Sequence, residues 1–424
     1  MGTRAEVLGL LRERNFRLLW FGETVSSGGS SMAAVLVPLL AVTTLHASTF
    51  AVAALTAASY LPWLIIGLPA GAWVDRLPVR PLMIACDVVA AALYASLPVL
   101  AWLGLLSIGD VLVIALLAGG ANVLFATAYQ VYLPSLISGA DLMEGNAKLQ
   151  GSASMAMIGG RSVAGVAAES LGAAPAVLFN AASFLVSAAC LLGIRRTPPE
   201  RTVPARTSLR AEIAQGARLI ARDRSLRSIT LYAAAGNLTY SGYNALLVVF
   251  LVKVAGFTAA MTGLLLSTVG VGGLAGALIA RRIGGRLGTR RAMQLTQLVT
   301  GAFALLIPLT RTGPAVSCYL AGAFTVSAGS LVGNILAASF RQAYCPPEML
   351  GRVVANMRFA AWGTIPLGAL LAGVLGTTLG VRAALWVVLG GYVLSGLILL
   401  GMPGAAEAPR LVMTEEKARH RTLS

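Results

Sequence analysis

Residues 67–80 read GLPAGAWVDRLPVR, a short turn that carries one carboxylate and two arginines. Long apolar runs flank it, at about 50–73 and 81–104. Each of these runs exceeds the roughly 20 apolar residues that a helix needs to cross a bilayer. The turn is therefore predicted to join two membrane-spanning helices on the basic side of the membrane.

Apolar runs and short polar turns continue along the whole chain. Of its 424 residues, 57% are hydrophobic and 11% are charged, whereas soluble domains carry about 25% charged residues. This composition excludes a soluble enzyme and a disordered chain. It also disfavours a nucleic-acid-binding protein, because the net charge of +16 is spread over many turns and not gathered on one soluble face. We predict twelve spans, at about 17–45, 50–73, 81–104, 109–133, 147–170, 174–194, 228–254, 258–280, 291–311, 314–339, 353–379 and 382–402.

The basic residues predict the orientation of the chain in the membrane. With the N-terminus inside, 27 of the 32 lysines and arginines fall in inner turns and tails. Cytoplasmic turns of membrane proteins carry such an excess. Both termini are therefore expected in the cytoplasm. The first apolar run is long and lacks a small-residue cleavage site, so it is expected to be retained as a span.

A long basic interval divides the chain into two halves. Within it, Leu209, Ile213 and Ile220 recur at helical spacing, which predicts an amphipathic helix on the inner membrane surface. A second basic turn, at 276–291, takes the same place in the second half as the first turn does in the first, which suggests duplicated six-helix units. We predict four parts: a six-helix bundle (1–194), a cytoplasmic linker (195–227), a second six-helix bundle (228–402) and a cytoplasmic tail (403–424).

The first turn resembles the signature of the major facilitator superfamily (MFS) between its second and third spans. Gly71, Asp75, Arg76 and Arg80 stand at matching positions, while prolines replace the usual glycine and second basic residue. The resemblance implies an all-α membrane protein of twelve transmembrane helices in two pseudo-symmetric six-helix bundles. It also implies that this cluster holds the cytoplasmic side shut, with Asp75 facing the start of span eleven. Two interpretations stay open for the arginines of the turn: a gate, or determinants of topology only.

Three further segments resemble the bacterial exporter branch of the superfamily. They are NFRLLW at 15–20, YLP at 132–134 and NAASF at 180–184. That branch contains macrolide efflux pumps and the enterobactin exporter. The resemblance covers nearly the whole chain and implies a transporter that works by alternating access.

Ionisable residues inside spans are costly and mark a pathway, a proton site or an internal ion pair. Glu23 lies about eight residues into the first span, a rise of roughly 12 Å, and the first span lines the central cavity in related transporters. We predict that Glu23 releases a proton when a cationic substrate arrives; a fixed ion pair is the alternative. Asp87 is expected to be a structural partner of the Asp75 turn, and Glu169 a solvated residue at the outer end of span five.

Arg161 departs from the pattern of the related exporters. They often carry G-P-x-x-G-G in span five, and here GRSVAG at 160–165 places Arg161 where the proline would stand. Arginine offers a bidentate partner to a carboxylate, catecholate or phosphate. Arg161 is therefore predicted either to contact an anionic substrate or to neutralise Glu23 or another acid. Arg358, at the start of span eleven, is assigned either to the gate or to snorkelling toward the inner surface.

Several uncharged polar residues inside spans are candidates for the cavity lining, with interhelical hydrogen bonding as the equal alternative. They are Asn122, Tyr129, Gln130, Asn237, Tyr240, Asn244 and Asn334. Four scattered cysteines and two histidines offer no metal site, and no catalytic residue or cofactor is expected. A phosphate-binding lysine motif is also absent from the sequence, which argues against direct drive by ATP.

The predicted function is export of a small amphipathic, drug-like or antibiotic-like molecule by proton-coupled alternating access. The predicted setting is a bacterial cell membrane, with the lipid bilayer, the substrate and the proton as partners, no nucleic acid, and a monomeric state. Arg161 motivates an alternative cargo, a siderophore or another anionic metabolite. A remote alternative of a different functional class is a lipid flippase-like factor or a membrane-embedded transferase. A transferase would need clustered nucleophiles or metal ligands, which the sequence lacks.

Overall fold

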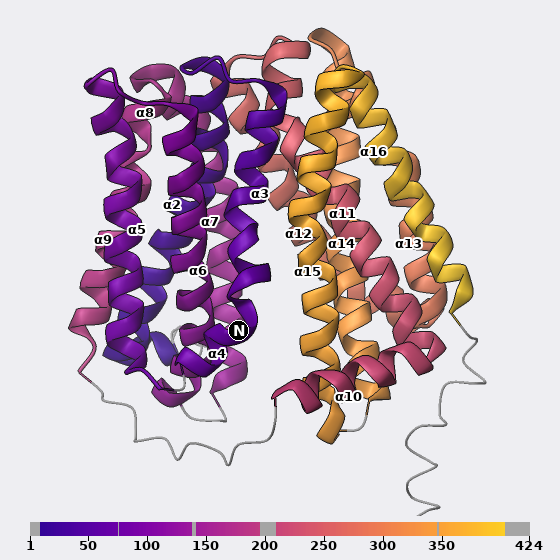
Figure 1. Cartoon of the computed structure of the whole chain (residues 1–424). Coiled ribbons are helices and arrows are strands. Elements are labelled where there is room, and N and C mark those ends of the chain that lie inside the picture. The colour runs from indigo at the N-terminus through magenta and orange to yellow at the C-terminus, as the bar shows by residue number, and fades with distance from the viewer. Residues whose placement is uncertain (1–8, 75, 138–140, 196–208, 346, 403–424) are drawn as a thin grey trace, which may run out of the picture. The chain divides into compact units, whose positions relative to one another are not determined.

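The computed structural model of the chain describes residues 9–74, 76–137, 141–195, 209–345 and 347–402 (Figure 1). Within these ranges all regular structure is helical and no strand occurs. Asp75, the carboxylate of the predicted gating motif, lies outside the described residues.

The helices of the first half follow the six predicted spans. They are η1 (Gly9–Arg12), α2 (Arg14–Thr43), α3 (Thr49–Ile65), α4 (Gly67–Val74), α5 (Val79–Trp102), α6 (Ile108–Leu136), α7 (Leu142–Leu171), α8 (Ala173–Ala176) and α9 (Leu178–Gly193). The second predicted span is divided between α3 and α4. Pro69 has no N–H to donate to the carbonyl of Ile65, so the hydrogen-bond ladder of the helix is interrupted there.

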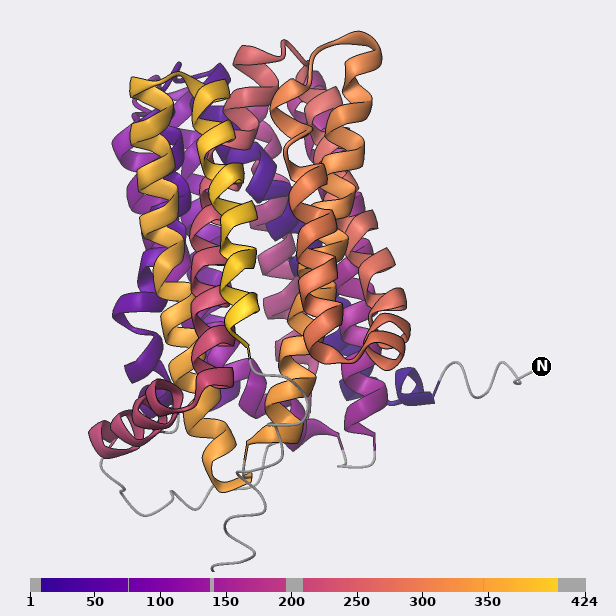
Figure 2. The ribbon, with the colours of Figure 1, turned by 90° about the vertical axis from the view of Figure 1, so that its right-hand side faces the viewer.

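The second half begins with the amphipathic linker helix and continues with six further spans. Its elements are α10 (Leu209–Arg222), α11 (Arg224–Val249), the π-helical η2 (Phe250–Val254), α12 (Ala259–Leu287), α13 (Thr289–Ala304), η3 (Ile307–Leu309), η4 (Gly313–Ala315), α14 (Val316–Tyr344), α15 (Pro347–Thr378), α16 (Val381–Ser395) and η5 (Gly396–Gly401). Figure 2 shows α10 lying crosswise at the lower end of α15, against which it packs.

Ten of the helical segments described here are long and apolar enough to cross a membrane. The other two predicted spans fall short for different reasons. The apolar helix α3 has 17 residues because its span is broken, and α7 has 30 residues but is interrupted by charged and hydroxyl side chains. The ten segments together with α3 and α7 correspond one to one to the twelve predicted spans, which confirms the all-α membrane architecture.

The chain forms two compact units. The first consists of Met1–Pro204 and Leu247–Gly270, and the second of Ala205–Leu246 and Val271–Ser424. The segment Leu247–Gly270, which joins the end of α11 to the start of α12, thus groups with the first unit. The predicted boundaries of the two bundles stay a prediction.

Polar contacts bind Leu247–Gly270 to the rest of the first unit. Lys253 Nζ donates to the carbonyl oxygen of Ala47 at 2.8 Å, and Glu169 Oε2 accepts from the Ala260 N–H at 2.8 Å. A carboxylate at the start of a helix satisfies free N–H groups and complements the helix dipole. Glu169 is exposed, as the sequence suggested, and its carboxylate also caps α12.

Glycines let the helices approach closely, as expected for membrane helices. A Cβ built on Gly119 of α6 would collide with the carbonyl oxygen of Ser59 in α3. A Cβ on Gly368 of α15 would likewise collide with the carbonyl oxygen of Leu238 in α11. Both units are thus packed through backbone contacts that only glycine permits.

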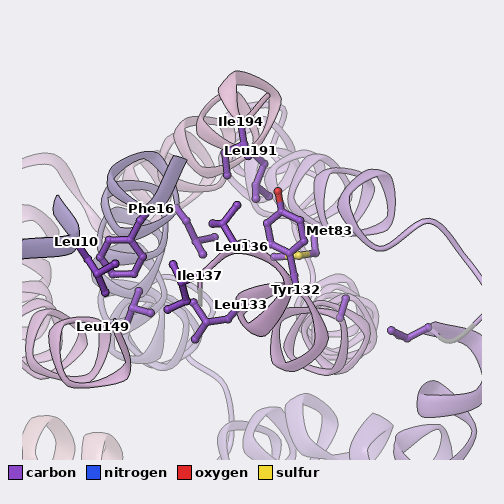
Figure 3. Packing of buried hydrophobic residues seen from close by; sticks show 13 residues of the cluster. Leu10, Phe16, Met83, Tyr132, Leu133, Leu136, Ile137, Leu149, Leu191 and Ile194 are labelled. Atoms are coloured by element: carbon purple, nitrogen blue, oxygen red, sulfur yellow. The ribbon is translucent and has the colours of Figure 1, made fainter. Parts of the chain in front are cut away.

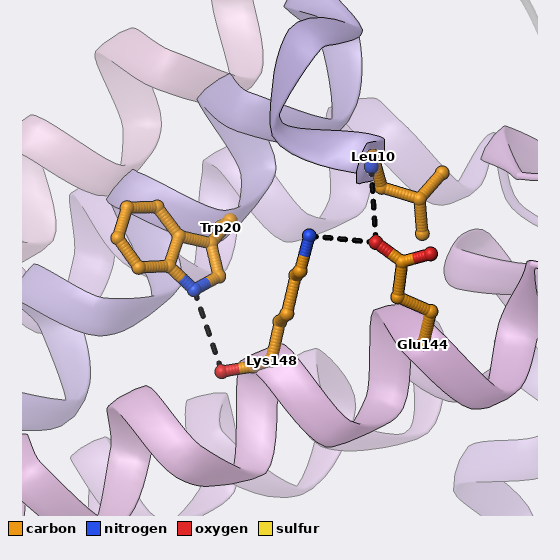
Figure 4. A network of polar contacts seen from close by, with 4 residues as sticks. All are labelled: Leu10, Trp20, Glu144 and Lys148. Atoms are coloured by element: carbon orange, nitrogen blue, oxygen red, sulfur yellow. Dashed lines mark hydrogen bonds and ion pairs between the residues drawn. The ribbon is translucent and has the colours of Figure 1, made fainter. Parts of the chain in front are cut away.

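A hydrophobic cluster and a charged network close one end of the first unit. The cluster draws buried side chains from η1, α2, α5, α6, α7 and α9, among them Phe16, Met83 and Tyr132 (Figure 3). Beside it, the Glu144 carboxylate accepts from Lys148 Nζ at 2.6 Å and from the Leu10 N–H at 3.1 Å (Figure 4). This network ties the N-terminal segment to the start of α7.

Candidate functional site

A cavity of about 370 Å³ lies inside the first unit. Five of its helices, α2, α5, α6, α7 and α9, contribute side chains to the wall. The lining residues are Glu23, Ser26, Ser27, Ser30, Ser31, Cys86, Asp87, Ala90, Ala118, Ala121, Asn122, Phe125, Gln150, Ala153, Ser154, Met157 and Phe184.

The run SSGGSS at 26–31 gives α2 its polar wall. Its two glycines are packing positions: a Cβ on Gly29 would collide with the Ser183 hydroxyl of α9, and the Gly28 carbonyl lies 2.6 Å from where a Cβ on Gly160 of α7 would stand. The four serines of the run all border the cavity. Close packing by the glycines thus holds a hydroxyl-rich surface at a fixed place.

Two carboxyl groups face this cavity, Glu23 from α2 and Asp87 from α5. Asp87 is 2% exposed, and its Oδ2 atom has no hydrogen-bond partner among the described residues, although its carboxyl group interacts with the Ser187 hydroxyl. Buried charges are costly unless they are paired. Two carboxyl groups in one cavity therefore favour a state in which at least one of them carries a proton.

Glu23 was singled out from the sequence, whereas Asp87 was assigned to the turn at Asp75. The structure places Asp87 in the cavity wall with Glu23. The serines of α2, together with Gln150 and Ser154 of α7, were not selected either. A mid-span run of four serines would have been a usable signal, because hydroxyl groups inside an apolar helix need a polar surface to face.

Arg161 lies apart from the residues that line the cavity. Its Nη1 atom donates to the carbonyl oxygen of Leu266 in α12 at 3.3 Å. Close by, Gly165 and Gly263 pack backbone to backbone, with a Cβ on Gly263 coming within 2.7 Å of the Gly165 backbone. Among the described residues Arg161 therefore contacts a main-chain carbonyl and neither of the two cavity acids.

The described residues of the gating motif have different environments. Nothing lies within 4 Å of a Cβ built on Gly71, and Arg76 is exposed. Arg80 donates from Nε to the carbonyl oxygen of Leu191 and from Nη2 to that of Leu192, both at 2.8 Å. Arginine near a helix C-terminus satisfies free carbonyls and complements the helix dipole. Arg80 therefore caps the C-terminus of α9.

Arg358, assigned from the sequence to the gate or to snorkelling, stacks over the ring of Trp362 on α15. Its Cζ atom lies 5.6 Å from the ring centroid, within the range of a cation–π interaction.

The uncharged candidates separate into cavity residues and packing residues. Asn122 lines the cavity, and Tyr129 stacks on the cavity residue Phe125 with ring centroids 6.4 Å apart. Gln130 is exposed. In these three cases the environment is set by which side of α6 the residue occupies.

In the second unit two of the candidates make main-chain hydrogen bonds. Asn237 Nδ2 donates to the Ala361 carbonyl of α15 at 3.0 Å, and Asn244 Nδ2 to the Tyr240 carbonyl of its own helix at 2.9 Å. Tyr240 packs against Tyr243, and Asn334 is exposed. Asn237 thus makes an interhelical hydrogen bond, which was the alternative to lining a cavity.

The chemistry of the cavity is acidic and hydroxyl-rich. The described lining residues include two carboxyl groups, five serine hydroxyl groups and two side-chain amides. They include no lysine, arginine or histidine. No group of three histidine, cysteine or acidic side chains suited to a metal ion occurs within the described ranges. The site can hold a small molecule through acidic and neutral hydrogen-bonding groups, with Phe125, Met157 and Phe184 as its apolar surface.

Comparison with known proteins shows the family of the chain. A family model described as transmembrane secretion effector, an MFS family, matches residues 5–414. The uncharacterized MFS-type transporter y4rN of Sinorhizobium fredii is 28% identical over 329 residues, which cover 76% of this chain and 78% of that protein. The multidrug efflux pump Tap of Mycolicibacterium fortuitum is 26% identical over 411 residues, which cover 92% of this chain and 96% of that protein.

Solved structures share the fold at low sequence identity. The nucleoside transporter NupG matches with a TM-score of 0.76 at 12% identity, over 92% of this chain and 98% of its own. An inward-facing bacterial homologue of the iron transporter ferroportin matches with a TM-score of 0.71 at 17% identity, over 91% of this chain and 98% of its own. The chain therefore belongs to the transmembrane secretion effector family of the major facilitator superfamily of membrane transporters.

Proposed function

We propose that this transporter exports a small cationic, amphipathic molecule from a bacterial cell in exchange for protons. The observation that carries the proposal is the cavity of the first unit, which presents Glu23 and Asp87 and no basic side chain among its described lining residues. The distribution of arginine predicts that both termini lie in the cytoplasm.

The two carboxyl groups supply the coupling. In an empty cavity, burial and the presence of two acids favour the protonated form of at least one of them. A cation that enters between them favours the charged form, so its binding displaces a proton. Protonation from the outer side would then release the cation, and one site would bind the proton and the cargo alternately.

The shape and polarity of the cavity suit a small organic cation. Its volume of about 370 Å³ falls in the range of about 300–1,000 Å³ of small-molecule pockets. The serine hydroxyls and Asn122 offer hydrogen bonds, while Phe125 and Phe184 offer aromatic surface to a cation. An amphipathic cation uses both kinds of surface.

Export is supported by the relatives. Tap of Mycolicibacterium fortuitum, which aligns over nearly the whole chain, is a multidrug efflux pump. The anionic alternative rested on Arg161, whose guanidinium donates to the Leu266 carbonyl and is not among the lining residues. The cationic cargo is therefore the better-supported one.

The proposal is tested with inside-out membrane vesicles from bacteria that express the chain. A pH gradient is imposed, and organic cations such as ethidium, or matched organic anions, are added while a fluorescent dye reports the gradient. We expect the cations, and not the anions, to dissipate the gradient. If only the anions dissipate the gradient, the proposal of a cationic cargo is wrong. If cation transport persists after addition of an uncoupler, the proposal of proton exchange is wrong.

A pair of variants assigns the effect to the cavity. The double variant E23Q/D87N keeps the shape of both side chains and removes both charges, so we expect no cation-dependent proton movement. D110N serves as the control, because Asp110 caps α6 in a box with Ser107 and is not among the residues that line the cavity. Equal loss in D110N and in the double variant would contradict a role of the cavity acids.

A further inference from the structure

Residues 281–291, the end of α12 and the start of α13, form a segment called here the α12–α13 turn. It carries five arginines: Arg281, Arg282, Arg286, Arg290 and Arg291. All but the half-buried Arg290 are exposed. None of the five has a carboxylate partner among the residues that the structure describes. The corresponding turn of the first half differs, because Arg80 there is bound to the carbonyls that end α9.

The position of two of these arginines is electrostatically unfavourable by itself. Arg290 and Arg291 lie in the first turn of α13, which has no acidic residue. The N-terminus of a helix presents free N–H groups and a partial positive charge, so it favours anions and disfavours cations. An anion at this turn would reverse the balance, because both the guanidinium groups and the helix end would then stabilise it.

A further donor at the turn lacks an acceptor. The Nε atom of Arg290 is buried and has no hydrogen-bond partner among the described residues. A buried donor without an acceptor is costly. The turn itself is anchored, since Ala292 and Met293 directly after the arginines are buried in the hydrophobic cluster of the second unit.

Apolar side chains lead away from the arginines along both helices. On α13, Arg291, Leu295 and Leu298 share one exposed face at helical spacing, and Leu298 is 68% exposed. On α12, Leu278 is 69% exposed and lies one turn before Arg282. In a membrane such faces contact acyl chains, and the arginines at their ends lie at headgroup depth.

We propose that the α12–α13 turn is a binding site for the phosphate headgroup of an anionic phospholipid of the inner leaflet. The phosphate takes the free donors of the arginines and the N-terminus of α13, and the acyl chains lie along the leucine faces of both helices. This site is independent of the proposed cargo and of proton exchange.

The test measures lipid binding to the purified transporter in detergent by native mass spectrometry. Phosphatidylglycerol and phosphatidylcholine with identical acyl chains are compared, and glycerol 3-phosphate is added as a soluble competitor. We expect phosphatidylglycerol to bind in preference to phosphatidylcholine and to resist glycerol 3-phosphate. Equal binding of both lipids would overturn the proposal, and displacement by the soluble competitor would assign the site to a free phosphate compound.

Matched variants locate the binding. R286Q/R290Q/R291Q is expected to bind phosphatidylglycerol at least about tenfold more weakly than the wild type does. R218Q/R222Q/R224Q removes the same charge near the start of α11 and is expected to bind as the wild type does. Equal weakening in both variants would indicate charge attraction without a site at this turn, and would overturn the proposal.

A charge-conserving variant keeps the test decisive if the glutamine variant fails to insert. R286K/R290K/R291K retains the basic residues that direct topology but loses bidentate contacts. We expect it to bind phosphatidylglycerol several-fold more weakly than the wild type. Unchanged binding would exclude an arginine-specific phosphate site.

Discussion

The two units use the same kind of helix packing but different polar chemistry. The first places Glu23 and Asp87 in its cavity. In the second, residues 228–402 contain a single acidic residue, Glu348, which directly precedes the apolar span of α15. Polar groups in the second unit are instead joined in a neutral network.

That network is centred on Gln297. Its Oε1 atom accepts from the Tyr232 hydroxyl at 2.8 Å, and its Nε2 atom donates to the Tyr392 carbonyl at 2.8 Å. Gln297 is 4% exposed, so its polar groups are satisfied by protein. The difference teaches that the buried Gln297 of the second unit is satisfied by protein and is structural, while the carboxyl groups of the first unit are ionisable and face a cavity.

Removing the charge of Glu23 should produce the largest effect. For E23Q we expect the proton-linked efflux rate to fall at least tenfold, a change of about 1.4 kcal/mol in the barrier or more, because glutamine keeps the shape but cannot exchange a proton. The measurement is the initial rate of cation-driven proton movement in inside-out vesicles. A rate within twofold of the wild type would end the assignment of coupling to Glu23, and D110N is the control.

Filling the glycine contacts should lower stability in both units alike. For G119A and G368A we expect a loss of about 1–3 kcal/mol, because each new methyl group would meet a main-chain carbonyl. Thermal unfolding in detergent measures it. The controls are G120A and G390A, where nothing lies within 4 Å of the added Cβ; a loss in a control equal to that of its partner would mean that helix propensity, not contact, sets the cost.

Breaking the neutral network should affect stability without affecting coupling. Q297L leaves the Tyr232 hydroxyl without its acceptor and should cost about 1–3 kcal/mol. Q294L, which removes a single half-buried hydrogen bond to the Leu399 carbonyl, should cost less. The readouts are the unfolding temperature and the ratio of protons to cations transported. A changed ratio in Q297L would show that the second unit also carries protons.

The smallest effect is expected at the charged network of Figure 4. The hydrogen bonds from Lys148 and from the Leu10 N–H hold the pKa of Glu144, in the first turn of α7, below its ordinary value. Its stabilisation is therefore present above the usual glutamate pKa of about 4.3 and is lost as the pH falls through the lower folded-state pKa.

Thermal unfolding of wild type and E144Q between pH 7 and pH 4 measures this contribution. We expect E144Q to be slightly less stable at pH 7 and the gap to close toward acid pH. E13Q, which removes an exposed carboxylate near the same end of the unit, is the control and should show no such gap. A gap that widens on acidification would contradict the stated sign.

Prediction from the sequence succeeded where the signal was local. The twelve apolar runs became helices at nearly the expected places. Glu23 and Asn122 border a cavity of the first unit, and their roles in transport stay predictions. Prediction from the sequence did not find the cavity beside Asp87 or the hydrogen bond of the exposed Glu169, because the neighbours of each lie on another helix. Asp87 shares its cavity wall with α2, and Glu169 bonds to Ala260, 91 residues away.

Hydropathy, the distribution of arginine and the 67–80 turn were sufficient to determine a twelve-span membrane transporter of the MFS. Those signals add up along the chain, since each residue contributes its own cost of transfer into lipid. Which polar side chains meet was decided only by tertiary packing. Contacts such as Gly28 against Gly160 set the rotation of each helix, and that rotation turns the serines of α2 into the cavity with Asp87 while Arg161 contacts α12.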